Sequence, residues 1–191
     1  MDLVLLAVGA IFVNNILLAQ YLGNCPFCGV SKQLSTAAGM GVAVIFVTTL
    51  ASIFTWLVYH HLLVPLDITY LKTLAFILVI AALVQLVEIF LKRHSRVLYD
   101  ALGIYLPLIT TNCAVMGIAL LNIKHELGFG SMLVFAIASA AGFALAIILF
   151  AGLRERLLLA PVPVAMRGTA IALVTAGVMS LAFLGFAGMV Q

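Results

Sequence analysis

Charged residues are scarce in this chain, and they fall in short clusters between long apolar runs. Of the 191 residues, 66% are hydrophobic and 8% are charged, against roughly a quarter charged in an average soluble domain. Nine Lys and Arg and six Asp and Glu cannot cover the surface of a soluble domain of this size. The apolar runs must therefore face lipid. The net charge of +3 is scattered among these runs, which excludes a nucleic-acid-binding surface.

Six apolar runs are long enough to cross a bilayer, which takes about 20 helical residues. They lack the polar and apolar alternation of a membrane β-barrel, so we expect an all-α integral membrane protein. No Lys or Arg precedes Lys32, so we expect the first helix to be retained rather than cleaved as a signal. The expected helices are Leu3 to about Gly29, Ala37–Tyr59, Leu71–Leu91, Leu98–Leu121, Phe129–Leu153 and Gly168–Val190.

The basic residues between these helices are distributed unequally over the two membrane sides. One side has only Lys72 and Lys124, and the other has seven basic residues. By the positive-inside rule the richer side is cytoplasmic, which predicts that both termini lie outside. The seven residues are Lys32, Lys92, Arg93, Arg96, Arg154, Arg156 and Arg167.

One short motif, Asn-Cys-x-x-x-Gly, occurs twice. It is found in Gly23-Asn24-Cys25-Pro26-Phe27-Cys28-Gly29 and in Thr111-Asn112-Cys113-Ala114-Val115-Met116-Gly117. Cys25 and Cys113 stand about half a chain apart, each late in the first helix of a group of three. Because three helices reverse the direction of entry, this predicts two inverted-topology repeats, about 1–92 and 93–191, in a single membrane domain.

Both motifs contain residues that are poor in a helix interior. These are Gly23, Asn24 and Pro26 in the first, and Pro107, Thr110, Thr111 and Asn112 in the second. We expect Asn24 or Cys25 to cap a helical turn opening at Pro26, and Asn112 to cap one opening at Cys113. Each sulfur would then lie at a helix N-terminus, where amide groups and the helix dipole favour the thiolate that binds metals.

A single such motif would be structural more often than not, since cysteine is a common packing residue. Two matching motifs in inverted halves favour a functional pair. Cys28 is expected to pack, because its counterpart is Met116. A disulfide between Cys25 and Cys28 is a weaker alternative inside a membrane.

Two thiolates are half of a zinc or iron–sulfur site, which commonly takes four protein ligands. We therefore expect a homologous subunit to supply the other two ligands, with a 2Fe-2S cluster held between the chains. Straight helices would place Cys25 and Cys113 toward opposite membrane surfaces. Sharing one site requires both helices to be broken or tilted.

Three longer stretches are Leu22–Phe27, Gly103–Val115 with its block Pro-Leu-Ile-Thr-Thr-Asn-Cys, and Arg167–Gly177. They resemble a family of membrane proteins that includes RnfA of the Rnf electron-transport complex and its counterpart, the E subunit of the sodium-pumping NADH:quinone reductase. The loop His60–Tyr70 and Val13-Asn14-Asn15 look more like the Rnf member. Cys28 stands where this family usually has Met.

The resemblance implies a multi-pass component of a bacterial inner-membrane complex, with its termini in the periplasm. Such a complex passes electrons between ferredoxin and NAD and couples them to Na+ or H+ transport. The resemblance also implies that Cys25 and Cys113 ligate a 2Fe-2S cluster shared with RnfE, the related E subunit of the Rnf complex. Flavin and nicotinamide chemistry would belong to other components, so that this chain is not catalytic alone. The expected supporting residues are Gly23, Asn24, Pro26, Thr111 and Asn112.

The inverted repeat by itself leaves an alternative open, a small secondary transporter without a redox role. A third and weaker hypothesis is that the chain is a purely structural scaffold.

Overall fold

The computed structural model describes residues 3–31, 33–65, 69–94, 106–159, 163 and 166–185. Every regular element within these ranges is a helix, as expected. Among the described residues, four segments are long and apolar enough to cross a membrane, and two shorter helices are also apolar. The four are Leu34–Leu63, Lys72–Ile89, Pro107–Lys124 and Phe129–Leu159, and the two are Val4–Val13 and Thr169–Leu184. The chain is therefore a multi-pass membrane protein.

Most of the helical segments near the expected breaks are short. Helix α1 (Leu3–Val8) continues as the π-helical turn η1 (Gly9–Val13), and α2 (Asn24–Val30) follows after an irregular segment. In the second half of the chain, α6 (Leu106–Thr110) is followed by α7 (Cys113–Lys124) after a break of two residues. Both expected interruptions are therefore present.

The other helices are longer. They are α3 (Leu34–Val58) with its π-helical extension η2 (Tyr59–Leu63), the 3-10 turn η3 (Thr69–Leu71) with α4 (Lys72–His94), α8 (Phe129–Leu159) and α9 (Thr169–Leu184).

Several expected helix bounds need correction, and the largest difference is in the fifth helix. The second helix begins at Leu34 rather than Ala37 and, with η2, reaches Leu63 rather than Tyr59. The fifth helix does not end at Leu153 but continues to Leu159. Arg154, Glu155 and Arg156 interrupt the apolar run without interrupting the helix, because Arg and Glu are good helix formers. Lys32, Arg96, the first part of the span expected from Leu98, and the end of the span expected to reach Val190 lie outside the described residues.

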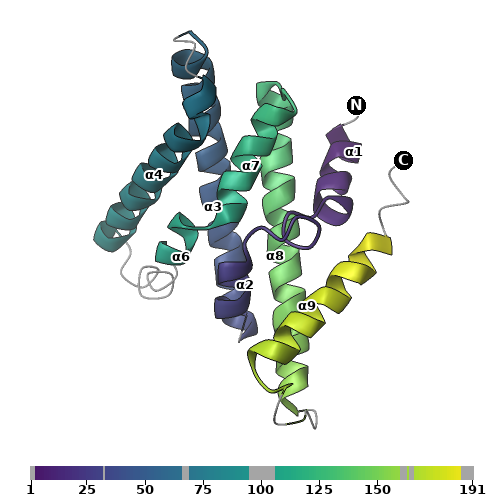
Figure 1. The fold of residues 1–191 in the computed structure, drawn as a ribbon. Coiled ribbons are helices and arrows are strands. Elements are labelled where there is room, and N and C mark those ends of the chain that lie inside the picture. Colours follow the sequence, from purple (N-terminus) through teal and green to yellow (C-terminus); the bar gives the residue numbers. More distant parts are fainter. Residues whose placement is uncertain are drawn as a thin grey trace.

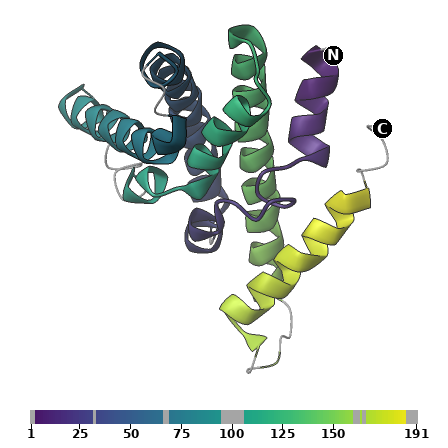
Figure 2. The ribbon, with the colours of Figure 1, turned by 45° about the horizontal axis from the view of Figure 1, so that its top comes forward.

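Helix α8 lies at the centre of the fold, beside α3 and α7, while α4 and α9 lie on opposite sides of this group (Figure 1, Figure 2). Close packing of α3 on α8 depends on small residues. A Cβ atom added to Gly41 would lie 2.9 Å from the Cβ of Ala144. Small residues at such crossings let helix backbones approach closely in membranes.

The outward faces of α4 and α9 are apolar, as expected for helices in contact with lipid or other membrane proteins. Their exposed side chains include Leu74, Leu78, Leu86 and Ile89 on α4 and Leu173, Val178 and Leu181 on α9.

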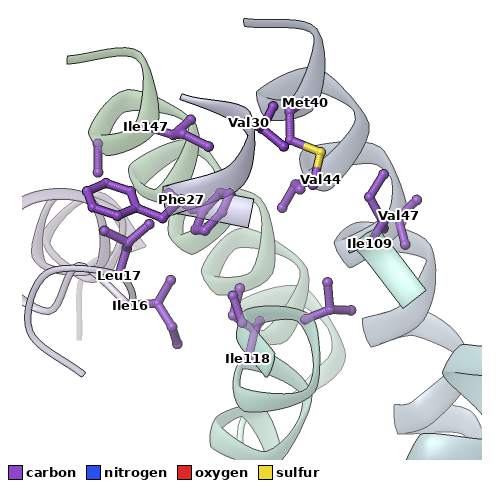
Figure 3. Close-up of a cluster of buried hydrophobic side chains, with 14 of the residues drawn as sticks. Ile16, Leu17, Phe27, Val30, Met40, Val44, Val47, Ile109, Ile118 and Ile147 are labelled. Carbon is purple, nitrogen blue, oxygen red and sulfur yellow. The ribbon is translucent and has the colours of Figure 1, made fainter. Parts of the chain in front are cut away.

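A buried apolar cluster surrounds α2 and links it to α3, α7 and α8 (Figure 3). Phe27 is the α2 side chain at the centre of this cluster, and its ring stacks on Phe150 of α8 with 3.9 Å between centroids. The cluster includes Ile16, Leu17, Val30, Met40, Val44, Val47, Ile109, Ile118 and Ile147. The short helix that bears Cys25 is thus anchored in the protein core.

Candidate cofactor site at two helix breaks

The irregular segment after η1 is held in place by Asn15, which is only 1% exposed. Its Oδ1 accepts hydrogen bonds from the backbone N–H groups of Leu17 (3.1 Å) and Leu18 (3.4 Å). Its Nδ2 donates to the carbonyl of Gly142 in α8 (2.8 Å). The hydroxyl of Ser180 in α9 donates to the carbonyl of Leu18 (2.8 Å).

Irregular backbone is tolerated within a membrane only where protein groups satisfy its hydrogen bonds. These contacts therefore stabilise the break as a defined part of the fold. Asn15 is a residue to which the motifs assigned no role. The signal that points to it is a polar amide within an otherwise apolar span.

Helix α2 begins immediately after Gly23, whose backbone is left-handed with φ of 92°. Asn24, Cys25 and Pro26 are the first three residues of the helix. The expectation that Asn24 or Cys25 caps a turn opening at Pro26 is wrong, because the N-cap is Gly23 and no side chain caps this end. Phe27 N–H donates to the Gly23 carbonyl (3.2 Å), which closes the first turn two residues earlier than expected. Pro26 fits in a first turn, where its missing N–H needs no partner.

Helix α7 begins as expected. Asn112 is the N-cap, and its Oδ1 accepts a hydrogen bond from the N–H of Ala114 (3.0 Å). Cys113 is therefore the first residue of the helix. Just before it, the hydroxyl of Thr111 donates to the Pro107 carbonyl (3.1 Å) and completes the end of α6.

The two breaks meet inside the fold. The backbone N–H of Gly23 donates a hydrogen bond to Sγ of Cys113 over 2.9 Å. A Cβ atom on Gly23 would lie 3.2 Å from both the Cβ of Ala114 and Oδ1 of Asn112. Cys25 follows Gly23 by two residues, so its Cα lies within about 7 Å of the Gly23 Cα. The breaks thus bring together motifs that straight helices would hold apart.

From this meeting point α2 and α7 run in opposite directions (Figure 1). Both cysteines stand at helix N-termini, Cys25 as the second residue of α2 and Cys113 as the first residue of α7. Both are free thiols on exposed residues. The prediction that Cys28 packs concerns a side chain outside the described part of the structure.

Within that part, no group of three or more His, Cys, Asp and Glu residues could hold a metal ion. Cys25 and Cys113 are two sulfur donors on exposed residues.

The far end of α2 is also fixed, through contacts with α8. Arg154 donates to the hydroxyl of Ser31 (2.9 Å), and this hydroxyl in turn donates to the carbonyl of Phe27. The Arg154 guanidinium lies 5.8 Å from the ring centroid of Phe150, which stacks on Phe27. Ser31, Phe27, Phe150 and Arg154 form one continuous set of contacts, here called the α2 clamp.

The fold and site define an all-helical, multi-pass membrane protein in which two interrupted helices present cysteines at converging helix starts. The family described as Rnf-Nqr subunit, membrane protein, matches residues 3–190, and the chain belongs to this family. This confirms the resemblance noted in the sequence.

The similarity to individual relatives covers nearly the whole length. The chain is 58% identical over 189 residues to the A subunit of the ion-translocating oxidoreductase complex of Syntrophotalea carbinolica, covering 99% of this chain and 98% of the relative. It is also 58% identical, with the same coverage, to the A subunit of the Na(+)-translocating ferredoxin:NAD(+) oxidoreductase complex of Acetobacterium woodii. The corresponding protein of Escherichia coli O139:H28 is 56% identical over 190 residues, covering 100% of this chain and 98% of the relative.

Proposed function

We propose that this chain is the A subunit of an ion-translocating ferredoxin:NAD+ oxidoreductase complex, and that it relays electrons there through a 2Fe-2S cluster held in part by Cys25 and Cys113. The full-length similarity to relatives of that name supports the assignment to the complex. The single observation that supports the relay is the contact between Gly23 N–H and Cys113 Sγ, which joins the two cysteine motifs.

The residues of this chain can supply half of the ligands of such a cluster. Cysteine thiolates are the usual ligands of a 2Fe-2S cluster, which takes four of them. This chain offers two, both exposed, so a second protein can approach and complete the set. The proposed partner is the homologous protein RnfE, related to this chain by a pseudo-twofold axis. When bound, the cluster supplies one-electron acceptance and donation.

The surrounding residues hold the two helix starts that carry the sulfurs. Each cysteine stands in the first turn of a helix, at the positive end of the helix dipole. The Gly23 N–H points directly at Cys113 Sγ. Hydrogen bonds to cluster sulfurs are among the features by which proteins set a cluster's potential. Asn112 holds the start of α7, and the α2 clamp holds the helix that bears Cys25.

We further propose six membrane spans arranged as two inverted repeats of three helices. In this arrangement α1, η1 and α2 form one broken span, and α6 and α7 form its counterpart. Helices α3 and α4 complete the first repeat, and α8 and α9 complete the second. Broken helices that meet between inverted repeats are a common location of functional sites in membrane proteins. The proposed location is the bacterial inner membrane, with both termini on the periplasmic side.

The test replaces each cysteine in the assembled, purified complex. Cys25→Ala and Cys113→Ala are each expected to remove the 2Fe-2S EPR signal, lower the iron and acid-labile sulfide content, and abolish ferredoxin-dependent NAD+ reduction. Cys28→Ala is the matched control and is expected to retain all three. If both variants keep the signal, the sulfide and turnover, the relay proposal is wrong. Substrate uptake by such redox-independent variants would instead favour the transporter alternative.

A further inference from the structure

A cavity of about 250 Å³ lies between the end of α3 and the end of α7. Its polar lining residues are Trp56, Tyr59, His60, Asn122 and Glu126. One ordered water needs only about 15 Å³ of such space, so the cavity can hold several waters or an ion with part of its hydration shell.

Two of these residues bury polar atoms without partners. Asn122 is 3% exposed, and within the described residues neither its Nδ2 nor its Oδ1 has a hydrogen-bond partner. The indole Nε1 of Trp56 is also buried and unpartnered there. Native proteins rarely leave buried polar atoms unpaired, and such atoms call for a bound water, ion or ligand. The cavity beside them is where that group would bind.

The unpartnered atoms continue from the cavity along α3. Thr48 and Ser52 lie two turns and one turn before Trp56, at i, i+4 and i+8 spacing, which places the three residues on one side of the helix. Both hydroxyl oxygens are buried without a partner in the part of the chain that the structure covers. The cavity is thus the end of a polar row that leads into the bundle.

Glu126 supplies an acidic group at the rim. It adopts a left-handed backbone with φ of 49°, at the helix-terminating position that glycine usually occupies. Its N–H donates to the carbonyl of Ile123 (3.0 Å), and the N–H of Leu127 donates to the carbonyl of Asn122 (3.2 Å). This closed turn holds Glu126 and Asn122 on the same cavity.

We propose that this cavity binds a hydrated monovalent cation. The Glu126 carboxylate and Asn122 Oδ1 are hard oxygen ligands that suit a cation. Asn122 Nδ2 and Trp56 Nε1 are donors, and they can pair with the oxygens of the ion's remaining waters.

The charge of the site also argues against an anion or a divalent cation as the ligand. No Lys or Arg among the described residues lines the cavity, and the carboxylate of Glu126 opposes an anion. Ca2+ generally takes about six to eight oxygen ligands, more than this site offers, and Mg2+ sites usually add substrate phosphates to their one or two carboxylates.

This inference rests on the ion-translocating part of the proposed function and not on the cluster. Asn122 and Cys113 stand on the same helix, nine residues apart, which is about 14 Å along the helix axis. Helix α7 runs away from the helix break (Figure 1), and the cavity lies at its other end. In the proposed orientation, the cavity lies toward the periplasmic surface.

The test measures equilibrium binding of radioactive 22Na+ to the assembled complex, with unlabelled Li+, K+ and choline as competitors. Asn122→Leu removes the amide and keeps the side-chain size, and it is expected to weaken Na+ binding at one site at least about tenfold. Asn122→Asp adds a carboxylate and is expected to retain or tighten binding. Gln85→Leu is the matched control, because it also replaces an amide with leucine, at an exposed position of α4. This variant is expected to bind Na+ as the unmodified complex does.

The 2Fe-2S EPR signal is recorded on the same samples and is expected to persist in Asn122→Leu, which separates failure of this site from failure of the cluster assignment. Unchanged Na+ binding in Asn122→Leu overturns the proposal, as does weaker binding in Asn122→Asp. If the complex does not assemble with Asn122→Leu, Na+ binding is measured in the Glu126→Gln and Trp56→Phe variants instead. Weaker Na+ binding in Glu126→Gln supports the site, and unchanged binding in both variants overturns it.

Discussion

The backbone N–H of Gly23 donates a hydrogen bond to the sulfur of Cys113, a residue 90 positions away in the chain, over 2.9 Å. The contact is possible because Gly23 has a positive φ of 92° and no Cβ atom. It places the start of α2, and with it Cys25, against the start of α7. The geometry of the candidate site therefore depends on a residue that has no side chain.

Replacing Gly23 with alanine should disrupt the site. The new Cβ would lie 2.6 Å from Cε2 of Phe143, and alanine disfavours a positive φ. The backbone cost of about 1 to 2 kcal/mol adds to an overpacking cost of about 1 to 3 kcal/mol. We expect loss of the 2Fe-2S EPR signal from the complex and a lower yield of assembled complex.

Gly39→Ala is the control for this prediction. Gly39 lies within α3, and a Cβ atom added to it has no neighbour within 4 Å. Alanine in a helix interior is more favourable than glycine by about 0.5 to 1 kcal/mol. Assembly and the EPR signal should persist in this variant, and equal behaviour of the two alanine variants would contradict the prediction.

Asn15→Leu should weaken the first helix break. The substitution removes the bonds to the N–H groups of Leu17 and Leu18 and to the carbonyl of Gly142. Hydrogen bonds between membrane helices are worth about 0.6 kcal/mol on average and up to about 1.7 kcal/mol, so we expect a loss of about 2 kcal/mol. The measurement is the thermal unfolding midpoint of the complex. Gln85→Leu on exposed α4 should leave the midpoint unchanged, and a normal midpoint in Asn15→Leu would refute this role.

Arg154→Met should loosen the α2 clamp. The variant loses the bond to the Ser31 hydroxyl and the cation–π contact with Phe150. A loss of about 1.4 kcal/mol in local stability raises the equilibrium constant for local opening about tenfold. Hydrogen–deuterium exchange of α2 amides, measured by mass spectrometry in the complex, should accelerate by about that factor. Arg156→Met, at an exposed position further along α8, should exchange as the unmodified chain does.

The proposed orientation can be tested with reporter fusions. Alkaline phosphatase fused to the C-terminus should be active and green fluorescent protein at the same point should be dark, because the positive-inside rule puts this end in the periplasm. A fusion after His94, which follows basic Lys92 and Arg93, should show the opposite pattern. Reversed activities at the two points would invert the assignment of sides.

The apolar runs and the paired motifs were sufficient to predict an all-helical membrane protein, both breaks and the Asn112 cap. These features depend on residues close together in sequence, since hydropathy, proline and capping preferences act over one or a few helical turns. The same reasoning put the start of the first motif's helix at Pro26. It could not locate the cap at Gly23, whose close neighbours Phe143 and Ala114 come from distant parts of the chain.

Two features were decided by the tertiary structure alone. The amide of Asn15 bonds to Gly142, 127 residues away, and this long-range contact helps to hold the first break near the second. The unpartnered Asn122 faces the same cavity as Trp56, from another helix. A sequence pattern states which residues can form a helix or carry a charge. Which of them meet depends on how closely the helices pack, and this is settled by side-chain volumes contributed from distant parts of the chain.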